Sequence, residues 1–192
     1  MPRHRTVGDD QILEAAVSAV GEVGPARLTL ADVGSKVGLS PATLIQRFGS
    51  KRALLLALAA HGADSMPSTI RAASEAEQPL DALVNVLVEF ATSVRSVAQF
   101  ANHLSFLLMD LSDPEFQELS QRHSASVREA IATVLAAAGL PGKGVGLSTA
   151  ELAGLVYSVY NGALITWGMD PRGRADEAVA SRLRHFFDLL PS

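Results

Sequence analysis

The chain contains no cysteine among its 192 residues. This absence excludes disulfides, zinc–thiolate sites and thiolate catalysis, and it fits a reducing compartment. No stretch alternates apolar and polar residues in the way that a half-buried strand does. The basic N-terminus, MPRHRTVGDD, is not followed by the apolar run of a signal peptide. We therefore expect a cytoplasmic protein whose core is large enough to fold without a metal or covalent staple.

Charge is distributed unevenly along the chain, whose net charge is −4. Residues 1–52 hold seven Lys or Arg against five Asp or Glu, a net charge of +2. The remaining residues hold nine against fifteen, a net charge of −6. A basic segment in front of an acidic body suits a protein that presents one end to phosphate. Chance scatter of a few charges explains the same asymmetry equally well.

Apolar residues spaced three and four apart are abundant, and they predict an all-α fold of about nine helices. Residues that favour helix starts stand where these apolar stripes begin. The predicted starts are Thr29 with Asp32, Ser40 with Pro41, Asp113 with Pro114, and Ser148 with Glu151. The last helix is expected over about residues 175–190.

The run GLSPA, residues 38–42, nearly matches the G-x-S-x-G motif of serine hydrolases, with Ser40 as nucleophile. That motif has to follow a β-strand, whereas the residues before this run have helical spacing. The residue after the serine must also donate its N–H to the oxyanion, and Pro41 has none. No carboxylate pair, nucleophile–base set or metal-ligand spacing occurs elsewhere. We therefore expect neither an enzyme nor a cofactor or metal site.

The stretch 31–47 has the spacing of a helix-turn-helix, two short helices joined by the turn GLS. The spacing turns Leu44 and Phe48 inward and leaves five side chains outward: Ala42, Thr43, Ile45, Gln46 and Arg47. Hydroxyl, amide and guanidinium groups can contact bases and phosphates, and an exposed isoleucine can contact a thymine methyl. By spacing alone, a DNA-reading unit and an ordinary corner of a helical protein fit this stretch equally well.

The run LTLADVGSKVGLSPATLIQRFGSKRALLLAL, residues 28–58, resembles the DNA-binding domain of tetracycline-repressor (TetR) family regulators. Ten residues match the family's pattern in register: Thr29, Val33, Gly38, Leu39, Ser40, Thr43, Leu44, Phe48, Lys51 and Leu54. The chain departs from it at Ile45, where Tyr is usual, and at Arg47, where His or Tyr is frequent. Gly34 and Val37 replace the family's small alanines.

The resemblance implies a three-helix DNA-binding domain at residues 1–52, with residues 1–8 as a flexible arm. In it, Thr29 and Lys51 would hold phosphates, and Arg47 would contact a phosphate or a base. The arm sequence PRHR can reach backbone phosphate or remain a disordered tail. The full predicted DNA-binding set is Thr29, Ser40, Pro41, Ala42, Thr43, Ile45, Gln46, Arg47 and Lys51.

Residues 53–192 would then form a helical domain for effector binding and dimerisation. Residues 152–169 contain no charged side chain, but their marginal length and interruption by glycine and polar residues argue against a membrane helix. In the TetR family the last two long helices form the dimer bundle. The resemblance therefore favours an interface made by Leu155, Val159, Val179, Leu183, Phe186 and Phe187.

An effector pocket is only weakly marked in the sequence. Aromatic and sulfur-containing side chains with a few polar groups are typical of such pockets. The candidates are Phe90, His103, Phe106, Met109, His123, Tyr157, Asn161 and Trp167, and ordinary core packing also explains each of them.

Together these features predict a homodimeric transcriptional regulator, with repression favoured over activation. It would bind a palindromic operator in double-stranded DNA and be released by a small-molecule effector. The alternative is a helical small-molecule-binding or scaffold protein that never contacts DNA.

Overall fold

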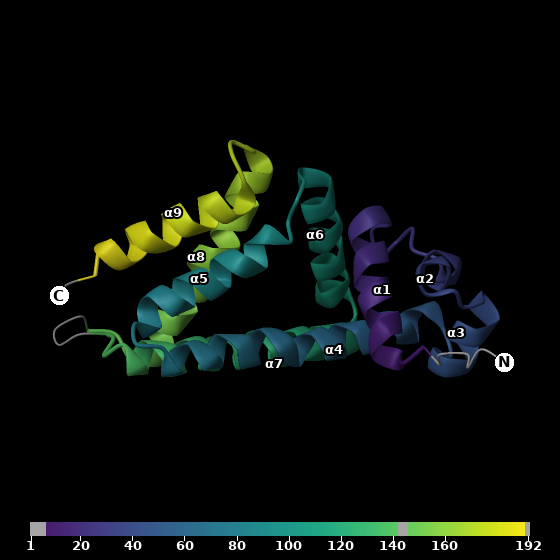
Figure 1. Cartoon of the computed structure of the whole chain (residues 1–192), viewed down its shortest axis with the longest axis horizontal. Helices are drawn as coiled ribbons and strands as arrows, with labels where there is room; N and C mark the ends of the chain where they lie inside the picture. Colours follow the sequence, from purple (N-terminus) through teal and green to yellow (C-terminus); the bar gives the residue numbers. More distant parts are fainter. Residues whose placement is uncertain (1–6, 142–145, 191–192) are drawn as a thin grey trace. The chain divides into compact units, whose positions relative to one another are not determined.

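The computed structural model describes residues 7–141 and 146–190, and in these ranges the fold is entirely helical (Figure 1). The predicted all-α fold is confirmed, and no strand occurs in the described residues. The arm residues 2–5 lie outside these ranges. The elements are α1 (Asp9–Val23), α2 (Leu30–Val37), α3 (Pro41–Phe48), α4 (Lys51–Ala72), the 3₁₀ turn η1 (Ala73–Glu75), α5 (Pro79–Thr92), α6 (Val97–Ser112), α7 (Pro114–Ala137), α8 (Thr149–Met169) and α9 (Ala175–Asp188).

Several helices begin where the capping residues predict. At the start of α8, the Ser148 hydroxyl accepts a hydrogen bond from the Glu151 N–H at 3.2 Å. The Glu151 carboxylate in turn accepts from the Ser148 N–H at 2.8 Å. The last helix ends at Asp188, two residues before the predicted end. There the N–H groups of Leu189 and Leu190 bond to carbonyls three residues back, which tightens the final turn.

Backbone contacts divide the chain into two compact units. The N-terminal unit comprises Met1–Gly62 and Ala98–Ser120, and the C-terminal unit comprises Ala63–Val97 and Gln121–Ser192. The predicted functional boundary at residue 52 does not coincide with this division. It stays a prediction, because compactness does not define which residues bind DNA.

The core of the N-terminal unit joins the predicted helix-turn-helix to α1. In this unit α1 packs against α2, and α2 packs against α3 (Figure 1). The side chains of Ile12, Val33 and Leu44 are fully buried. The same cluster includes Leu13, Ala16, Ala19, Val20, Leu28, Leu54, Leu55, Leu58 and Phe116. This apolar contact holds the short helices, which are too short to be stable alone.

In the C-terminal unit, α9 packs against both α5 and α8 (Figure 1). The buried side chains of this unit include Leu83, Leu87, Leu152, Val156, Trp167, Val179 and Leu183. Among the described residues, no helix has the length and apolar character needed to cross a bilayer.

Candidate nucleic-acid interface

Thr29 starts α2 through a reciprocal capping box. Its hydroxyl accepts a hydrogen bond from the Asp32 N–H at 3.2 Å and donates one to Asp32 Oδ2 at 2.6 Å. The Thr29 N–H donates to the same carboxylate oxygen at 2.7 Å. The hydroxyl and then the N–H lower the pKa of Asp32, because both stabilise the ionised carboxylate. A phosphate at this position would therefore meet a threonine whose hydroxyl proton is already donated.

The turn after α2 explains why residue 34 is glycine. Gly38 adopts the left-handed conformation, with φ 71° and ψ 28°, and ends the helix. The Leu39 N–H then donates to the Gly34 carbonyl at 3.0 Å. A Cβ atom on Gly34 would lie 2.3 Å from the Leu39 carbonyl oxygen. An alanine at this position would therefore require the turn to shift.

Ser40 and Thr43 organise the start of α3. The Ser40 hydroxyl accepts from the Thr43 N–H at 3.1 Å and lies 2.9 Å from the Thr43 hydroxyl. Pro41 occupies the first turn, where its missing N–H costs no hydrogen bond. The predicted cap at Ser40 is confirmed. The Thr43 residue is half-buried.

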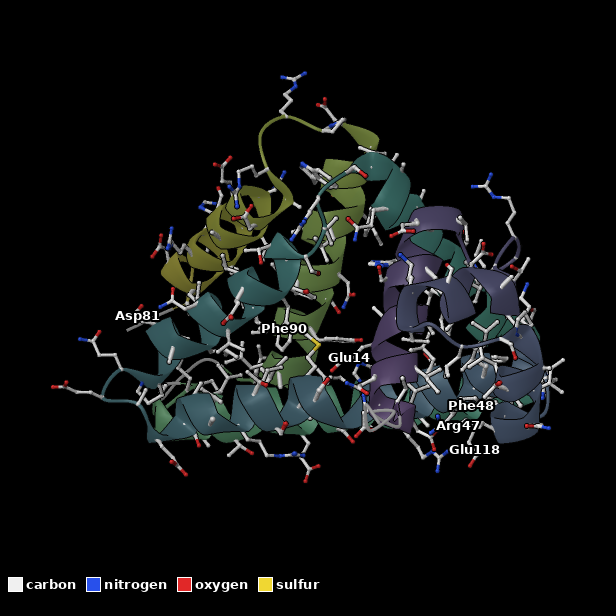
Figure 2. All side chains as sticks on the ribbon, turned by 45° about the vertical axis from the view of Figure 1, so that its right-hand side comes forward. Glu14, Arg47, Phe48, Asp81, Phe90 and Glu118 are labelled. Carbon is white, nitrogen blue, oxygen red and sulfur yellow. The ribbon has the colours of Figure 1, made fainter. Side chains whose placement is uncertain are left out.

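The two faces of α3 differ as the spacing predicts. Leu44 is fully buried, and Phe48 packs against the same core. Ala42, Gln46 and Arg47 are exposed, and the Ile45 side chain is 51% exposed. Figure 2 shows Phe48 and Arg47 at the end of this helix. The outer face of α3 thus presents the Ala42 methyl, the Ile45 side chain and the Gln46 amide. The buried Leu44 side chain fixes the helix against the core.

Arg47 is held by the beginning of α1. One guanidinium nitrogen lies 2.5 Å from Asp9 Oδ1, and the other donates to the Val7 carbonyl at 2.6 Å. No sequence signal indicates this contact, because Val7 and Arg47 are 40 residues apart. The predicted DNA role of Arg47 is not tested by this geometry, but the side chain already has two partners.

The next two basic residues, at the start of α4, are also engaged. Lys51 donates to the Ala26 carbonyl at 2.8 Å. Arg52 lies 2.8 Å from Asp113 and 2.9 Å from Glu115. Its guanidinium also stands 5.7 Å from the centre of the Phe116 ring. Lys51 and Arg52 therefore each already have a partner within the chain.

The predicted pocket residues do not belong to one compact unit. His103, Phe106 and Met109 lie in the N-terminal unit and the other five in the C-terminal unit. Phe106 packs edge-on against Phe116, with ring centres 5.9 Å apart. Burial lowers the pKa of His103, which favours a neutral imidazole.

Two cavities of the C-terminal unit include predicted pocket residues. One, of about 380 Å³, is lined by Trp167 together with Thr92, Val94, Arg95 and residues 173–176. The Trp167 indole N–H donates to the Gly173 carbonyl at 3.2 Å. The other, of about 500 Å³, is lined by Tyr157 with Leu147 and residues of α7 and α8. Burial raises the pKa of the neighbouring residue Tyr160, which the sequence did not mark, to about 12.

The predicted dimer residues divide into two groups. Val179 and Leu183 are fully buried within the chain itself, so they add no surface for a second copy and their assignment is corrected. They turn inward because α9 packs on α5 as well as α8. Leu155, Val159, Phe186 and Phe187 keep exposed or half-exposed surface. The sequence prediction missed three exposed apolar side chains on these helices or just beyond them: Ile165, Met169 and Leu189.

Solved structures share this fold over nearly the whole chain. A TetR transcription regulator from Haloarcula marismortui has a TM-score of 0.74 and 17% identity, covering 95% of this chain and 97% of its own. SmeT, the repressor of the Stenotrophomonas maltophilia multidrug efflux pump SmeDEF, has a TM-score of 0.68 and 17% identity, covering 96% and 91%. The TetR-family transcriptional regulator PfmR from Thermus thermophilus has a TM-score of 0.63 and 24% identity, covering 94% and 99%.

The sequence comparison is local. No curated protein sequence matches the chain. The family profile of the bacterial regulatory proteins of the tetR family matches residues 12–58, from α1 into α4. This segment holds the capping box, the turn and the outer face of α3 described above. Residues 12–58 therefore match the tetR family of bacterial regulatory proteins, and the fold of the chain is that of solved TetR-family regulators.

Proposed function

We propose that the chain is a dimeric repressor that binds a palindromic operator through α3 and is released by a small-molecule effector. Residues 1–52 would bind DNA in the cytoplasm, and residues 53–192 would bind the effector and form the dimer. One observation carries the proposal: the outer face of α3 is exposed while Leu44, on its inner face, is fully buried. A short helix seated in this way can enter the major groove as a rigid body.

Each exposed group of α3 has a matching partner in DNA. The Gln46 amide can form two hydrogen bonds with adenine, and Ile45 can contact a thymine methyl. The N–H groups of Ser40 and Ala42 at the start of α3 would face a phosphate, with Pro41 and Thr43 beside them. Thr29 and Lys51 would flank these contacts. The Lys51 ammonium has three donors, so it can keep the Ala26 carbonyl and still bind a phosphate.

A dimer provides the two copies of α3 that a palindrome requires. Half-sites read by two such helices are about 34–36 Å apart, or a multiple of that spacing. We assign the dimer face to α8 and α9, where a groove of about 310 Å³ is open on the surface. Its lining includes Val159, Gly162, Phe186 and Leu189. Small residues at the floor of a groove allow another helix to approach closely.

Effector release requires a ligand that prefers the arrangement unable to bind DNA. The eight candidate residues for its pocket remain part of this proposal, which places the effector in the cavity beside Trp167. Repression is favoured because SmeT, which shares the fold, is the repressor of an efflux pump. The effector itself is to be found by screening for molecules that change Trp167 fluorescence, since the chain has one tryptophan.

Selection from a random duplex pool provides the test, because it needs no prior operator sequence. The wild-type chain should enrich a palindrome, and Gln46→Ala should weaken binding to that duplex by about 1–3 kcal/mol. A matched control is Gln117→Ala, which removes an exposed amide from α7 and should leave binding unchanged. Unchanged binding by Gln46→Ala would remove Gln46 from the contacts, and failure to enrich any duplex would refute DNA recognition.

A further inference from the structure

The cavity of about 380 Å³ beside Trp167 is lined by two connections of the chain, and every lining residue belongs to the C-terminal unit. Thr92, Val94 and Arg95 come from the end of α5 and the residues that follow it. Trp167 comes from the last turn of α8, and residues 173–176 lead into the first turn of α9. The volume lies within the range of about 300–1,000 Å³ that is usual for small-molecule sites.

One part of this lining is apolar and held in place. Trp167 is only 7% exposed, and its indole N–H donates to the Gly173 carbonyl at 3.2 Å. This hydrogen bond satisfies the one polar group of the indole and fixes the ring. Ala175 is buried and Val94 is half-buried. The lining therefore favours a ligand with a flat apolar body, because a planar group can stack on a fixed ring.

The charged groups of the lining are the guanidinium groups of Arg95 and Arg174 and the carboxylate of Asp176, which give a net charge of +1. Arg174 Nε donates to Asp176 Oδ1 at 2.9 Å, and Arg174 Nη2 donates to Oδ2 at 2.8 Å. The hydrogen bond from Arg174 lowers the pKa of Asp176, so this carboxyl is ionised at neutral pH. The negative charge of the lining is thus balanced by a guanidinium within the protein.

A cation is the other charged ligand to consider, because an indole ring and a carboxylate both attract cations. Both oxygens of Asp176 already accept hydrogen bonds from Arg174, and a cation here would also face two guanidinium groups. A carboxylate ligand meets the opposite situation. Guanidinium groups match its geometry, and Arg174 Nη1, which takes no part in the two bonds to Asp176, can donate to it.

We propose that this cavity binds a small carboxylate with a flat apolar body, held by Arg95 and Arg174 at the charged end and by Trp167 at the apolar end. The inference rests on the proposed function, because it names the chemical class of the effector in the cavity assigned to it. The negative charge of the ligand cancels the net charge of the lining, and this complementarity selects an anion over a cation.

Three probes of nearly the same shape separate charge from size: benzoate is an anion, benzamide is neutral and benzamidinium is a cation. Each is titrated into the full-length chain without DNA at constant ionic strength. Trp167 fluorescence reports binding, because the chain has one tryptophan. Benzoate should bind at least about tenfold more tightly than benzamide, since its hydrogen bonds are assisted by charge. Benzamidinium should bind more weakly than benzamide.

Arg95→Gln should lower the affinity for benzoate by about tenfold and leave the affinity for benzamide nearly unchanged, because it removes a charge and keeps a polar side chain. The matched control is Arg172→Gln. Arg172 lies on the same connection as Arg174 but outside the lining, and its Nε donates to Asp170 at 3.1 Å. This control should keep the wild-type affinities for both probes.

Asp176→Asn tests the site by a gain of affinity, which misfolding does not produce. The substitution releases Arg174 from its ion pair and makes the lining more positive by one charge. Benzoate should therefore bind to this variant more tightly than to the wild-type chain, while thermal unfolding verifies that each variant is folded. Weaker benzoate binding by a folded Asp176→Asn chain would overturn the proposed selection by charge.

A preference for benzamide or benzamidinium over benzoate, or binding of none of the three, would also overturn the carboxylate site. Equal losses in Arg95→Gln and Arg172→Gln would do the same. The effector role is tested separately, by adding benzoate to the chain bound to its enriched duplex. Duplex release from the wild-type chain but not from Arg95→Gln supports that role. Benzoate binding without release supports the carboxylate site and overturns its part in the proposed function, and failure to enrich any duplex overturns the proposed function alone.

Discussion

At residue 34 the helix-turn-helix leaves no room for a side chain. The Leu39 carbonyl oxygen lies where a Cβ atom of residue 34 would have to be, at 2.3 Å. Helix propensity alone favours alanine over glycine by about 1 kcal/mol. Local geometry and propensity therefore make opposite predictions for this position.

Gly34→Ala should destabilise the protein despite the better helix former. The turn must shift to admit the methyl group, and overpacking of this kind costs about 1–3 kcal/mol. Urea unfolding followed by circular dichroism measures the change. Gly21→Ala is the control, because there a Cβ would meet Gln99 and His103 at ordinary contact distances of 3.5 and 3.6 Å. A Gly34→Ala chain as stable as the control would show that the turn is looser than described.

Within the N-terminal unit, Arg52 joins the first turn of α4 to the start of α7. Its guanidinium bonds to both oxygens of Asp113 and to Glu115, and it lies over the Phe116 ring. The hydrogen bond from Arg52 is the main reason that the pKa of Asp113 lies below its ordinary value. The helix that follows α3 is thus connected to the junction of α6 and α7.

This connection should make stability depend on acidic pH. A carboxyl whose pKa is lowered by folding stabilises the protein above its unfolded pKa, near 3.9 for Asp. That stabilisation is lost as the pH falls through the lower pKa of the folded state. Arg52→Gln should therefore destabilise the chain at neutral pH and flatten its acid dependence, as measured by thermal unfolding between about pH 7 and pH 3. An Arg52→Gln chain with the wild-type acid profile would contradict this role.

The elements were more predictable than their contacts. Thr29, Ser40 and Ser148 signal helix starts because a cap involves neighbours three residues away. The contact of Arg47 with Asp9 involves no such local pattern. Apolar spacing likewise showed that Val179 and Leu183 are buried on one stripe, but not whether the same chain or a partner covers them. For the same reason it could not assign the pocket candidates to one unit.

For the whole molecule, the proposed DNA recognition requires a dimer, because one α3 helix would cover only a few base pairs. Leu155 and Ile165 on α8, and Leu189 directly after α9, are exposed to solvent at 43%, 44% and 70%. Exposed apolar side chains of this size are available for burial against a partner. A second copy of the chain is the partner that our proposal assigns to them.

Leu155→Glu should dissociate the dimer without unfolding the chain. A carboxylate placed in an apolar interface lacks a partner and disfavours association. Sedimentation equilibrium measures the mass, and operator affinity should fall together with dimer stability. Val17→Glu is the matched control, since Val17 is 50% exposed on α1 and outside this face. A Leu155→Glu chain that stays dimeric would place the interface elsewhere.

The most direct test of the central claim is the salt dependence of binding to the duplex enriched by the wild-type chain. A dimer that contacts six or more phosphates should lose about 10³-fold or more in affinity between 50 and 200 mM salt. The logarithm of affinity should fall linearly with the logarithm of salt concentration. Affinity that is independent of salt, or no enriched duplex at all, would contradict DNA recognition by α3.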